Sequence, residues 1–452
     1  MTKKVEKGKE AGQAESESRP AALVLRPPLA ERNGALLVGG CPATDLADKY
    51  GTPLYVYDEK RIRENVRRLR GAFERHWKNF KLYYPLKTNS NLAILRILRQ
   101  EGTGADCSNP NEIFLASAAG FGPKEMLYTG NYNSRDEFRE ALDAGATINL
   151  DDIWLLDKLL KVGKPERLSF RVNVGGSGAH AGLVFGAGDT KFGIPARLAT
   201  KAYRLAKDAG IKSFGIHTMG GSGVLDASYF PKLAAALVEV IGDIVKEVGI
   251  GFDFIDLGGG FGVPYKPEEV ELDIAKVGKE VCDVMRDATA RYRLGSPELC
   301  FEPGRYLVCD AGVMLARVHH VKRHDSAPVF AGTDAGMNSL IRPALYGAHH
   351  EILVANELRR GGASVKTTVT GQVCENTDVL AKEREMPEVR EGDLLAVLNV
   401  GAYGFGMSSQ YNNRPRAAEI LAFEGVSEII RERETASDLL ARMRVPGRLT
   451  GR

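Results

Sequence analysis

Three groups of residues in the sequence have the types and positions needed for chemistry on an amine. The first is Lys87, which ends an apolar run in YYPLKTNSN. At the end of a buried strand, a lysine loses solvent, so we expect a lowered pKa and an amine that attacks an aldehyde. Taken alone, a solvated lysine at a strand end is the commoner explanation. The other two groups of residues therefore determine whether Lys87 is interpreted as a reactive lysine.

The second group is a glycine tract, DLGGGFG at 256–262, which contains Gly258, Gly259 and Gly260. Glycines let backbone N–H groups approach an anion closely. The tract lacks the lysine of a P-loop and the spacing of a dinucleotide fingerprint. Ser222, in HTMGGSG, adds a hydroxyl donor. These features predict a site for a monophosphate rather than for ATP or NAD.

The third group is Glu302 in FEPGRY. A carboxylate beside a phosphate site repels the phosphate unless a cation lies between them. The protonated nitrogen of a pyridine ring is such a cation. A lysine, a phosphate site and a carboxylate together describe a site for pyridoxal 5'-phosphate.

The elements that must position these groups alternate between strand and helix. One expected helix, KRIRENVRRLRGAF, has an apolar stripe of Ile62, Val66, Leu69 and Phe73. Eight strands in about 250 residues favour a (β/α)8 TIM-like barrel, whose reactive groups lie at the carboxyl ends of the strands, over a doubly wound sheet. The expected strands are Phe80–Tyr84, Gly104–Cys107, Met126–Gly130, Thr147–Leu150, Leu168–Val172, Phe214–Thr218, Phe252–Leu257 and Leu299–Glu302.

A second, mostly β domain is expected after the barrel, where helical periods give way to apolar runs between Gly and Asn turns. Our predicted boundaries are a disordered tail at 1–22, a segment at 23–50 that joins the β domain, the barrel at 51–308 and the β domain at 309–445. The fold class is therefore α/β, a barrel plus a C-terminal β domain.

Composition limits the partners and the compartment. The 61 Lys and Arg against 58 Asp and Glu are too balanced for binding to nucleic acid. No apolar stretch is long enough for a membrane span, the N-terminus has no signal-peptide core, and the six cysteines form no CxxC pair. We therefore expect a cytoplasmic protein with a small-molecule partner and no metal site.

The motifs resemble those of the fold-type III pyridoxal phosphate enzymes, the group of alanine racemase and the ornithine and diaminopimelate decarboxylases, and most closely the last. The resemblance implies an alanine racemase-like barrel, pyridoxal 5'-phosphate as cofactor, and a homodimer with active sites at the interface. The matching segments keep the family's order and include YGTPLYVYDEKRIREN, YYPLKTNSN, GNYNS, KFGI, DLGGGFGVPY, FEPGRY, DAGMNSLIRPALYGAHH, CENTDVL, GAYGFGMSSQYNNRPR and IRERET.

The resemblance also implies roles for single residues. Lys87 matches the lysine that binds the cofactor, Glu302 the acid on its pyridine nitrogen, and Cys374 a catalytic group from the other subunit, our candidate proton donor. The remaining matches are Ser222, Gly258, Gly259, Gly260 and Tyr403 for the phosphate, Asp106, Glu112 and Arg171 around the lysine and ring, Arg305, Arg342 and Tyr346 for the substrate's far carboxylate, and Glu375 for its far ammonium, with Tyr403 also facing the substrate.

Two positions depart from the family pattern. Met219 stands where the family usually has a histidine stacked on the cofactor ring, and a thioether packs there without sharing a proton. His217, two residues earlier on the same strand, is a candidate to replace it. The family's CES-x-D reads CENTD here, so the serine is changed while Cys374, Glu375 and Asp378 remain.

The implied reaction is decarboxylation of meso-2,6-diaminopimelate to L-lysine and CO2, the last step of lysine biosynthesis. A glutamate on the ring nitrogen favours decarboxylation, because alanine racemases have an arginine there. Two alternatives stay open at this point. One is a decarboxylase for another amino acid, such as a D-amino acid or a carrier-bound glutamyl group, which Met219 motivates. The other is a non-catalytic protein that binds pyridoxal phosphate.

Overall fold

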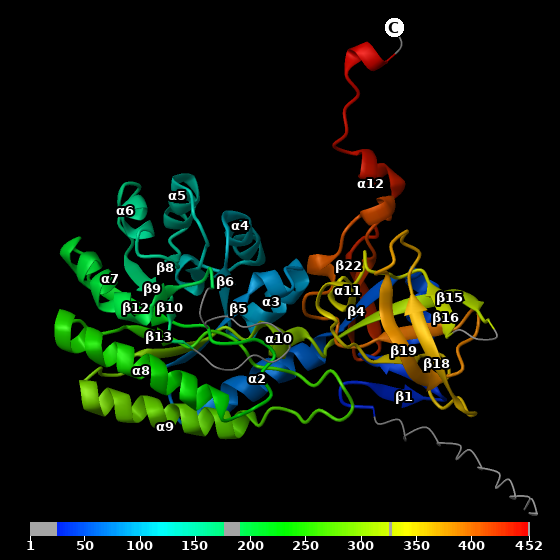
Figure 1. Ribbon diagram of the computed structural model, residues 1–452, viewed down its shortest axis with the longest axis horizontal. Coiled ribbons are helices and arrows are strands. Elements are labelled where there is room, and N and C mark those ends of the chain that lie inside the picture. The colour runs from blue at the N-terminus through cyan, green and yellow to red at the C-terminus, as the bar shows by residue number, and fades with distance from the viewer. Residues whose placement is uncertain (1–24, 176–189, 325–327, 451–452) are drawn as a thin grey trace, which may run out of the picture.

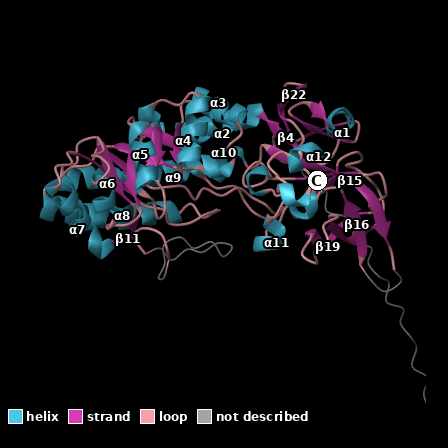
Figure 2. Cartoon of the chain, turned by 90° about the horizontal axis from the view of Figure 1, so that it is seen from above, coloured by secondary structure: helices cyan, strands magenta, loops and turns pink. Residues whose placement is uncertain are grey.

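The computed structural model describes residues 25–175, 190–324 and 328–450, which form a barrel domain and a β domain side by side (Figures 1 and 2). The tail predicted at 1–22 lies outside the described residues. No helix in these ranges is long and apolar enough to cross a membrane.

The predicted barrel is confirmed. Eight parallel strands close in the order β12-β13-β14-β5-β6-β7-β8-β9. All eight lie where the sequence predicts them, with ends that differ by at most two residues. Their bounds are β5 Phe80–Pro85, β6 Gly104–Cys107, β7 Met126–Tyr128, β8 Thr147–Leu150, β9 Arg167–Phe170, β12 Ser213–His217, β13 Phe254–Asp256 and β14 Glu298–Phe301.

Helices surround this barrel and cover its outer face (Figure 1). The stripe predicted on the first of them is buried, since Ile62, Val66, Leu69 and Phe73 of α2 are all inaccessible to solvent. Burying such side chains stabilises the fold by about 1.5–3 kcal/mol each. The helices are α2 Glu59–Glu74, α3 Leu92–Gln100, α4 Pro110–Ala119, α5 Arg135–Asp143, α6 Leu155–Leu160, α7 Ala196–Asp208, α8 Tyr229–Val248, α9 Ile274–Tyr292 and α10 Gly304–Val308.

The β domain is built on a mixed sheet of nine strands in which β19-β18-β16-β15-β4-β21-β22 are neighbours, while β20 pairs with β15 and β17. Its strands are β4 Leu54–Asp58, β15 Gly312–Lys322, β16 Val329–Thr333, β17 Ile352–Val354, β18 Ser364–Thr370, β19 Val379–Pro387, β20 Leu394–Val397, β21 Ala418–Phe423 and β22 Val426–Arg431. The smaller elements are β1 Ala30–Arg32, β2 Ala35–Val38, β3 Cys41–Pro42, β10 Val172–Asn173, β11 Ile194–Pro195, α1 Ala43–Tyr50, α11 Arg342–Tyr346 and α12 Ala436–Leu440.

Strand β4 lies inside the range 51–308 expected for the barrel, but it pairs with β15 and β21 of the β sheet. No strand was predicted at Leu54–Asp58, and hydrophobic periodicity does not show which sheet a strand joins. The segment before β4 also contacts the β domain. Leu36 and Val38 pack in one apolar cluster with Val313 and Leu394.

Candidate active site

A cavity of about 350 Å³ opens at the carboxyl ends of the barrel strands. Residues of the β domain close one side of it, so both domains build the site. The lining consists of Pro85, Lys87, Asp106, Ser108, Thr129, Asn131, Arg171, Phe192, His217, Met219, Ser222, Gly260, Phe261, Glu302, Gly304, Arg305, Arg342, Tyr346, Tyr403 and Met407.

Lys87 faces this cavity from the turn that follows β5. Its Nζ lies 3.2 Å from Oδ2 of Asp106, which is buried at the end of β6. The lowered pKa expected for Lys87 is wrong. Burial alone lowers it, but the charges of Asp106 and Glu302 and the hydroxyl of Tyr403 outweigh burial and raise the pKa above its ordinary value. In this structure, Lys87 is therefore a charged amine held by a carboxylate.

At Asp106, in contrast, burial has the largest effect on the pKa. Burial, and then the charge of Glu302, raise its pKa from 3.8 to about 7, although Lys87 acts to lower it. Its second oxygen, Oδ1, is buried and has no partner among the described residues. Glu112, the other predicted acid near the lysine, does not line the cavity. Its carboxylate accepts hydrogen bonds from the backbone N–H and the hydroxyl of Ser108, at 2.6 and 2.7 Å.

The glycine tract after β13 has no room for side chains. A Cβ on Gly258, whose φ is +68°, would lie 2.5 Å from the carbonyl oxygen of Thr218. A Cβ on Gly259 would lie 2.3 Å from the carbonyl oxygen of Glu302. The side chain of Asp256 accepts a hydrogen bond from the N–H of Gly258 at 2.8 Å and thereby fixes the turn. These positions require glycine because the backbone of the tract packs directly against the backbone after β12 and β14.

Glu302, at the end of β14, lies among three groups that set its charge. Burial raises the pKa of Glu302, but His217, Lys87 and Arg171 outweigh burial and hold it below its ordinary value. The neighbouring carboxyl of Asp256 behaves differently, because burial and then the charge of Glu302 raise its pKa well above 3.8. The site therefore favours the ionised form of Glu302 and the protonated form of Asp256.

His217 supports this arrangement from β12. The amide of Asn149 accepts a hydrogen bond from Ser169 through Oδ1 at 2.6 Å, so its Nδ2 donates to Nδ1 of His217 at 3.0 Å. The imidazole hydrogen is then on Nε2, which lies 3.5 Å from Oε2 of Glu302. Oε1 of Glu302 is buried and has no hydrogen-bond partner among the described residues, so it is available to a ligand.

Met219 also lines the cavity, and its sulfur accepts a hydrogen bond from the N–H of Gly259 at 3.1 Å. The thioether therefore packs on the glycine tract. Arg171, on the next strand of the barrel, has its guanidinium 3.5 Å from Oδ1 of Asp151 and 4.6 Å from the ring centre of Phe192.

The side of the cavity toward the β domain carries positive charge. Arg305 comes from α10 and Arg342 from α11, and both are buried. The guanidinium of Arg305 lies 5.1 Å from the ring centre of Tyr403. Tyr346, one turn after Arg342, is exposed at the rim.

Cys374 and Glu375 are both exposed and do not line the cavity of their own chain. Their loop is nevertheless held in place. Asp378 accepts hydrogen bonds from the N–H groups of Met337 and Val373, at 2.6 and 2.7 Å, and Asn412 accepts one from the N–H of Cys374 at 2.6 Å. A fixed loop that presents its cysteine outward is suited to contact another molecule.

The residues fit pyridoxal 5'-phosphate. Of the three predicted glycines, Gly260 lines the cavity together with Ser222 and Lys87, and a backbone N–H and a hydroxyl suit a phosphate, whereas the N–H groups of Gly258 and Gly259 bond to Asp256 and Met219. Oδ1 of Asp106, Oε1 of Glu302 and Nε of Arg305 are buried polar atoms without a protein partner within the described part of the chain. Such atoms are costly unless a ligand satisfies them.

Reasoning from the sequence missed several lining residues. Ser108 and Thr129 belong to none of the matching segments, and Phe192 lies in KFGI but was given no role; the fold of the barrel brings all three to the cavity. Asp256, which does not line the cavity, lies two residues before Gly258, and its place at the start of the glycine tract was the signal available for it.

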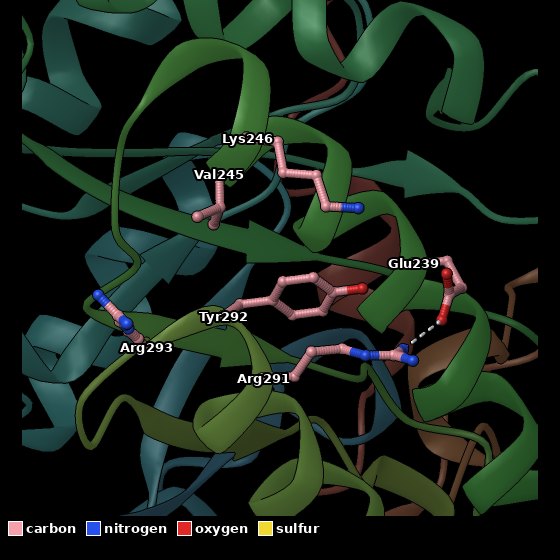
Figure 3. Close-up of a pocket in the computed structure, with 6 residues that line it drawn as sticks. All are labelled: Glu239, Val245, Lys246, Arg291, Tyr292 and Arg293. Atoms are coloured by element: carbon pink, nitrogen blue, oxygen red, sulfur yellow. Dashed lines mark ion pairs between the residues drawn. The ribbon is translucent and has the colours of Figure 1, made fainter.

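A second hollow, of about 430 Å³, lies between α8 and α9 (Figure 3). It is lined by Glu239, Val245, Lys246, Arg291, Tyr292 and Arg293. Arg291 pairs with Glu239 at 3.5 Å across the opening, where both side chains are exposed. None of the residues predicted for chemistry lies here, so we place the active site at the barrel mouth.

Comparisons with known proteins agree with this site. Residues 59–309, more than half of the chain, match the family described as pyridoxal-dependent decarboxylase, pyridoxal binding domain. A diaminopimelate decarboxylase of Methanothermobacter thermautotrophicus is 48% identical over 93% of this chain and 98% of its own length. One of Thermoplasma acidophilum is 42% identical over 89% of this chain and 96% of its own length.

Among solved structures, the diaminopimelate decarboxylase of M. jannaschii in complex with L-lysine is similar to this chain. The TM-score is 0.83 at 32% identity, over 93% of this chain and 98% of that one. These matches confirm the fold, the cofactor and the enzyme class that the sequence predicts. The chain is a pyridoxal 5'-phosphate-dependent carboxy-lyase that belongs to the diaminopimelate decarboxylase family.

Proposed function

We propose that this enzyme removes one carboxylate from meso-2,6-diaminopimelate and releases L-lysine and CO2, as the names of its relatives indicate. The observation that carries the proposal is the pairing of two regions in one cavity. Lys87 and Glu302 occupy the side where a cofactor ring fits, and two buried arginines occupy the side toward the β domain.

Bound pyridoxal 5'-phosphate supplies an electron sink for the pair of electrons left at Cα when CO2 departs. Glu302 holds a proton on the ring nitrogen through Oε1, and His217 keeps that carboxylate oriented. Lys87 would hold the cofactor through its aldehyde in the absence of substrate, and the same amine would serve to release the product. The glycine tract and Ser222 bind the phosphate and fix the position of the ring.

Arg305 and Arg342 select the substrate. Guanidinium groups bind a carboxylate with two parallel hydrogen bonds. Diaminopimelate has a second carboxylate at its far end, whereas ornithine, lysine and arginine have only the one that reacts. We assign Tyr346, at the rim, to the same carboxylate.

We also propose that the enzyme is a homodimer. Cys374 and Glu375 lie on a fixed, exposed loop outside their own cavity, so we propose that they complete the cavity of a second subunit. The thiol of Cys374 then returns a proton to Cα, and Glu375 accepts a hydrogen bond from the far ammonium. We also propose the cytoplasm as the compartment, because all six cysteines are free thiols.

Turnover on a panel of substrates tests the reaction. The purified protein with cofactor is offered meso-diaminopimelate, L- and D-lysine, ornithine, arginine and glutamate, and released CO2 and product amine are quantified. We expect turnover of diaminopimelate alone. Turnover of another amino acid in its place would contradict the proposed substrate and support the alternative that Met219 motivates.

Mixed subunits test the dimer. Lys87→Ala and Cys374→Ala are each expected to be inactive as pure proteins, because each lacks one part of every site. Mixing them should restore up to about a quarter of the wild-type activity, since a random mixture of two chains is half heterodimer and each heterodimer has one intact site. No recovery after exchange of subunits would argue against a shared site.

A further inference from the structure

Tyr265 lies between the two arginines of the substrate side. It belongs to the barrel loop after the glycine tract, and its hydroxyl accepts a hydrogen bond from Nη1 of Arg305 and another, at 3.0 Å, from Nη1 of Arg342. The guanidinium groups also lie over its ring, 5.6 and 5.0 Å from the centre. The hydroxyl of Tyr265 thus holds two guanidinium groups close together, although their like charges repel each other.

The directions of these hydrogen bonds are fixed by chemistry. A guanidinium only donates, so the hydrogen of Tyr265 must point elsewhere, and the sulfur of Cys309 lies 3.0 Å away. The thiol of Cys309 in turn donates to the carbonyl oxygen of Asn399 at 3.2 Å. Burial raises the pKa of Tyr265 to about 12, so the hydroxyl keeps its proton at neutral pH.

His350 holds Arg342 from the β domain. Its Nδ1 lies 2.8 Å from the carbonyl oxygen of Leu398, which only accepts, so the imidazole hydrogen is on Nδ1. Nε2 then accepts a hydrogen bond from Nη1 of Arg342 at 2.9 Å. Burial, and then the charge of Arg342, lower the pKa of His350 to about 3, so it stays neutral. It is completely buried.

Among the described residues of this network, no carboxylate neutralises the positive charges of Arg305 and Arg342. Within the described residues, the acceptors of the two guanidiniums are a tyrosine hydroxyl and a neutral imidazole, and neither guanidinium has an ion pair with a carboxylate. Two buried cations without a carboxylate require an anion from outside. Since Nη1 of each arginine is already engaged, the other N–H groups remain for that anion. The buried Nε of Arg305 has no partner in the part of the chain that the structure describes.

We propose that Tyr265 and His350 are positioning residues that set the spacing and orientation of Arg305 and Arg342 for the far carboxylate of the substrate. The inference rests on the proposed function and adds to it the source of the specificity. Loss of one carboxylate from diaminopimelate leaves the far one on L-lysine. The same network should therefore bind the product L-lysine through this carboxylate. Cadaverine, the corresponding diamine without a carboxylate, should receive no binding energy from the network.

The test uses Tyr265→Phe in the cofactor-loaded enzyme. Hydrogen bonds to charged groups contribute enough for their loss to raise the KM for diaminopimelate about 10- to 100-fold. We expect kcat and the absorbance of the bound cofactor to stay near wild type. The inhibition constant of L-lysine should rise by a similar factor, and that of cadaverine should stay unchanged.

Tyr203→Phe is the matched control, because Tyr203 is a buried barrel tyrosine whose hydroxyl donates to the carbonyl oxygen of Gly215 and accepts from the N–H of Phe170. It should leave the ratio of the two inhibition constants unchanged. His350→Leu is the second variant, and His350→Gln, which retains an acceptor, should restore part of the affinity for diaminopimelate. In an Arg342→Ala background, His350→Leu should change KM by less than about twofold, because the residue it positions is gone.

Two results would overturn the inference. One is a Tyr265→Phe enzyme that loses kcat or cofactor absorbance while its KM and its L-lysine inhibition stay at wild type, which would make Tyr265 a residue of the cofactor side. The other is an equal loss of affinity for L-lysine and cadaverine, which would indicate a general defect of the cavity. A wild-type enzyme that does not act on diaminopimelate would refute the proposed function itself, and the inference with it.

Discussion

Replacing Asp106 by Asn should stabilise the cofactor-free protein above neutral pH. The carboxyl of Asp106 is buried, and burial, then Glu302, raise its pKa from 3.8 to about 7. Between those two values, the folded protein holds a proton that the unfolded chain releases. The free energy of unfolding contributed by this group therefore falls as the pH rises through that window.

The size of the effect follows from the shift. At about 1.4 kcal/mol per unit, a pKa raised from 3.8 to about 7 costs the folded state about 4 kcal/mol at pH 8. Asn carries no charge at any pH, but the substitution also removes the ion pair with Lys87. We therefore expect a net gain of about 2 kcal/mol at pH 8 and almost none at pH 4.

Urea unfolding of the cofactor-free protein at pH 4, 6 and 8 measures this difference. Asp157→Asn is the control, since Asp157 pairs with Lys161 on the surface and its side chain is 74% exposed. Its effect should be small and the same at each pH. A gain for Asp106→Asn that does not depend on pH, or a variant less stable than wild type at pH 8, would refute the reasoning.

Three further variants probe the cofactor and substrate sides. Gly259→Ala places a Cβ 2.3 Å from a carbonyl oxygen and should weaken cofactor binding about 10-fold or more, measured by absorbance titration. Gly251→Ala is the control, because a Cβ there meets open space and cofactor binding should not change. Glu302→Gln should lower kcat about 100-fold or more while borohydride still fixes the cofactor to Lys87, and an unchanged kcat would remove Glu302 from the chemistry. Arg342→Ala should raise the KM for diaminopimelate about 10- to 100-fold, and an unchanged KM would remove Arg342 from substrate binding.

The barrel could be predicted because each of its strands is a short apolar run followed by a polar or glycine residue. In a parallel barrel, those following residues meet at one end. This is why Lys87, Glu302 and the glycine tract, which are far apart in the sequence, lie around one cavity. Strand β4 was not predicted as a strand, and it lies inside the range expected for the barrel although it pairs with β15 and β21 of the β domain.

The electrostatics could not be read from the sequence. The pKa of Lys87 depends on the balance between burial and four neighbouring groups, Asp106, Tyr403, Glu302 and Glu112, which come from different parts of the barrel and from the β domain. Tyr265 and His350 end two of the matching segments, but no role could be assigned to them until the fold placed both within hydrogen-bonding distance of Arg342. Side-chain partners of this kind are set by packing between domains.

The most direct test of the whole account is a single-turnover measurement with meso-diaminopimelate. Wild-type enzyme and Lys87→Ala, each supplied with pyridoxal 5'-phosphate, are compared for released CO2 and for L-lysine. The account predicts one CO2 and one L-lysine per wild-type site and neither from Lys87→Ala. Equal release by the two proteins, or CO2 without L-lysine, would contradict it.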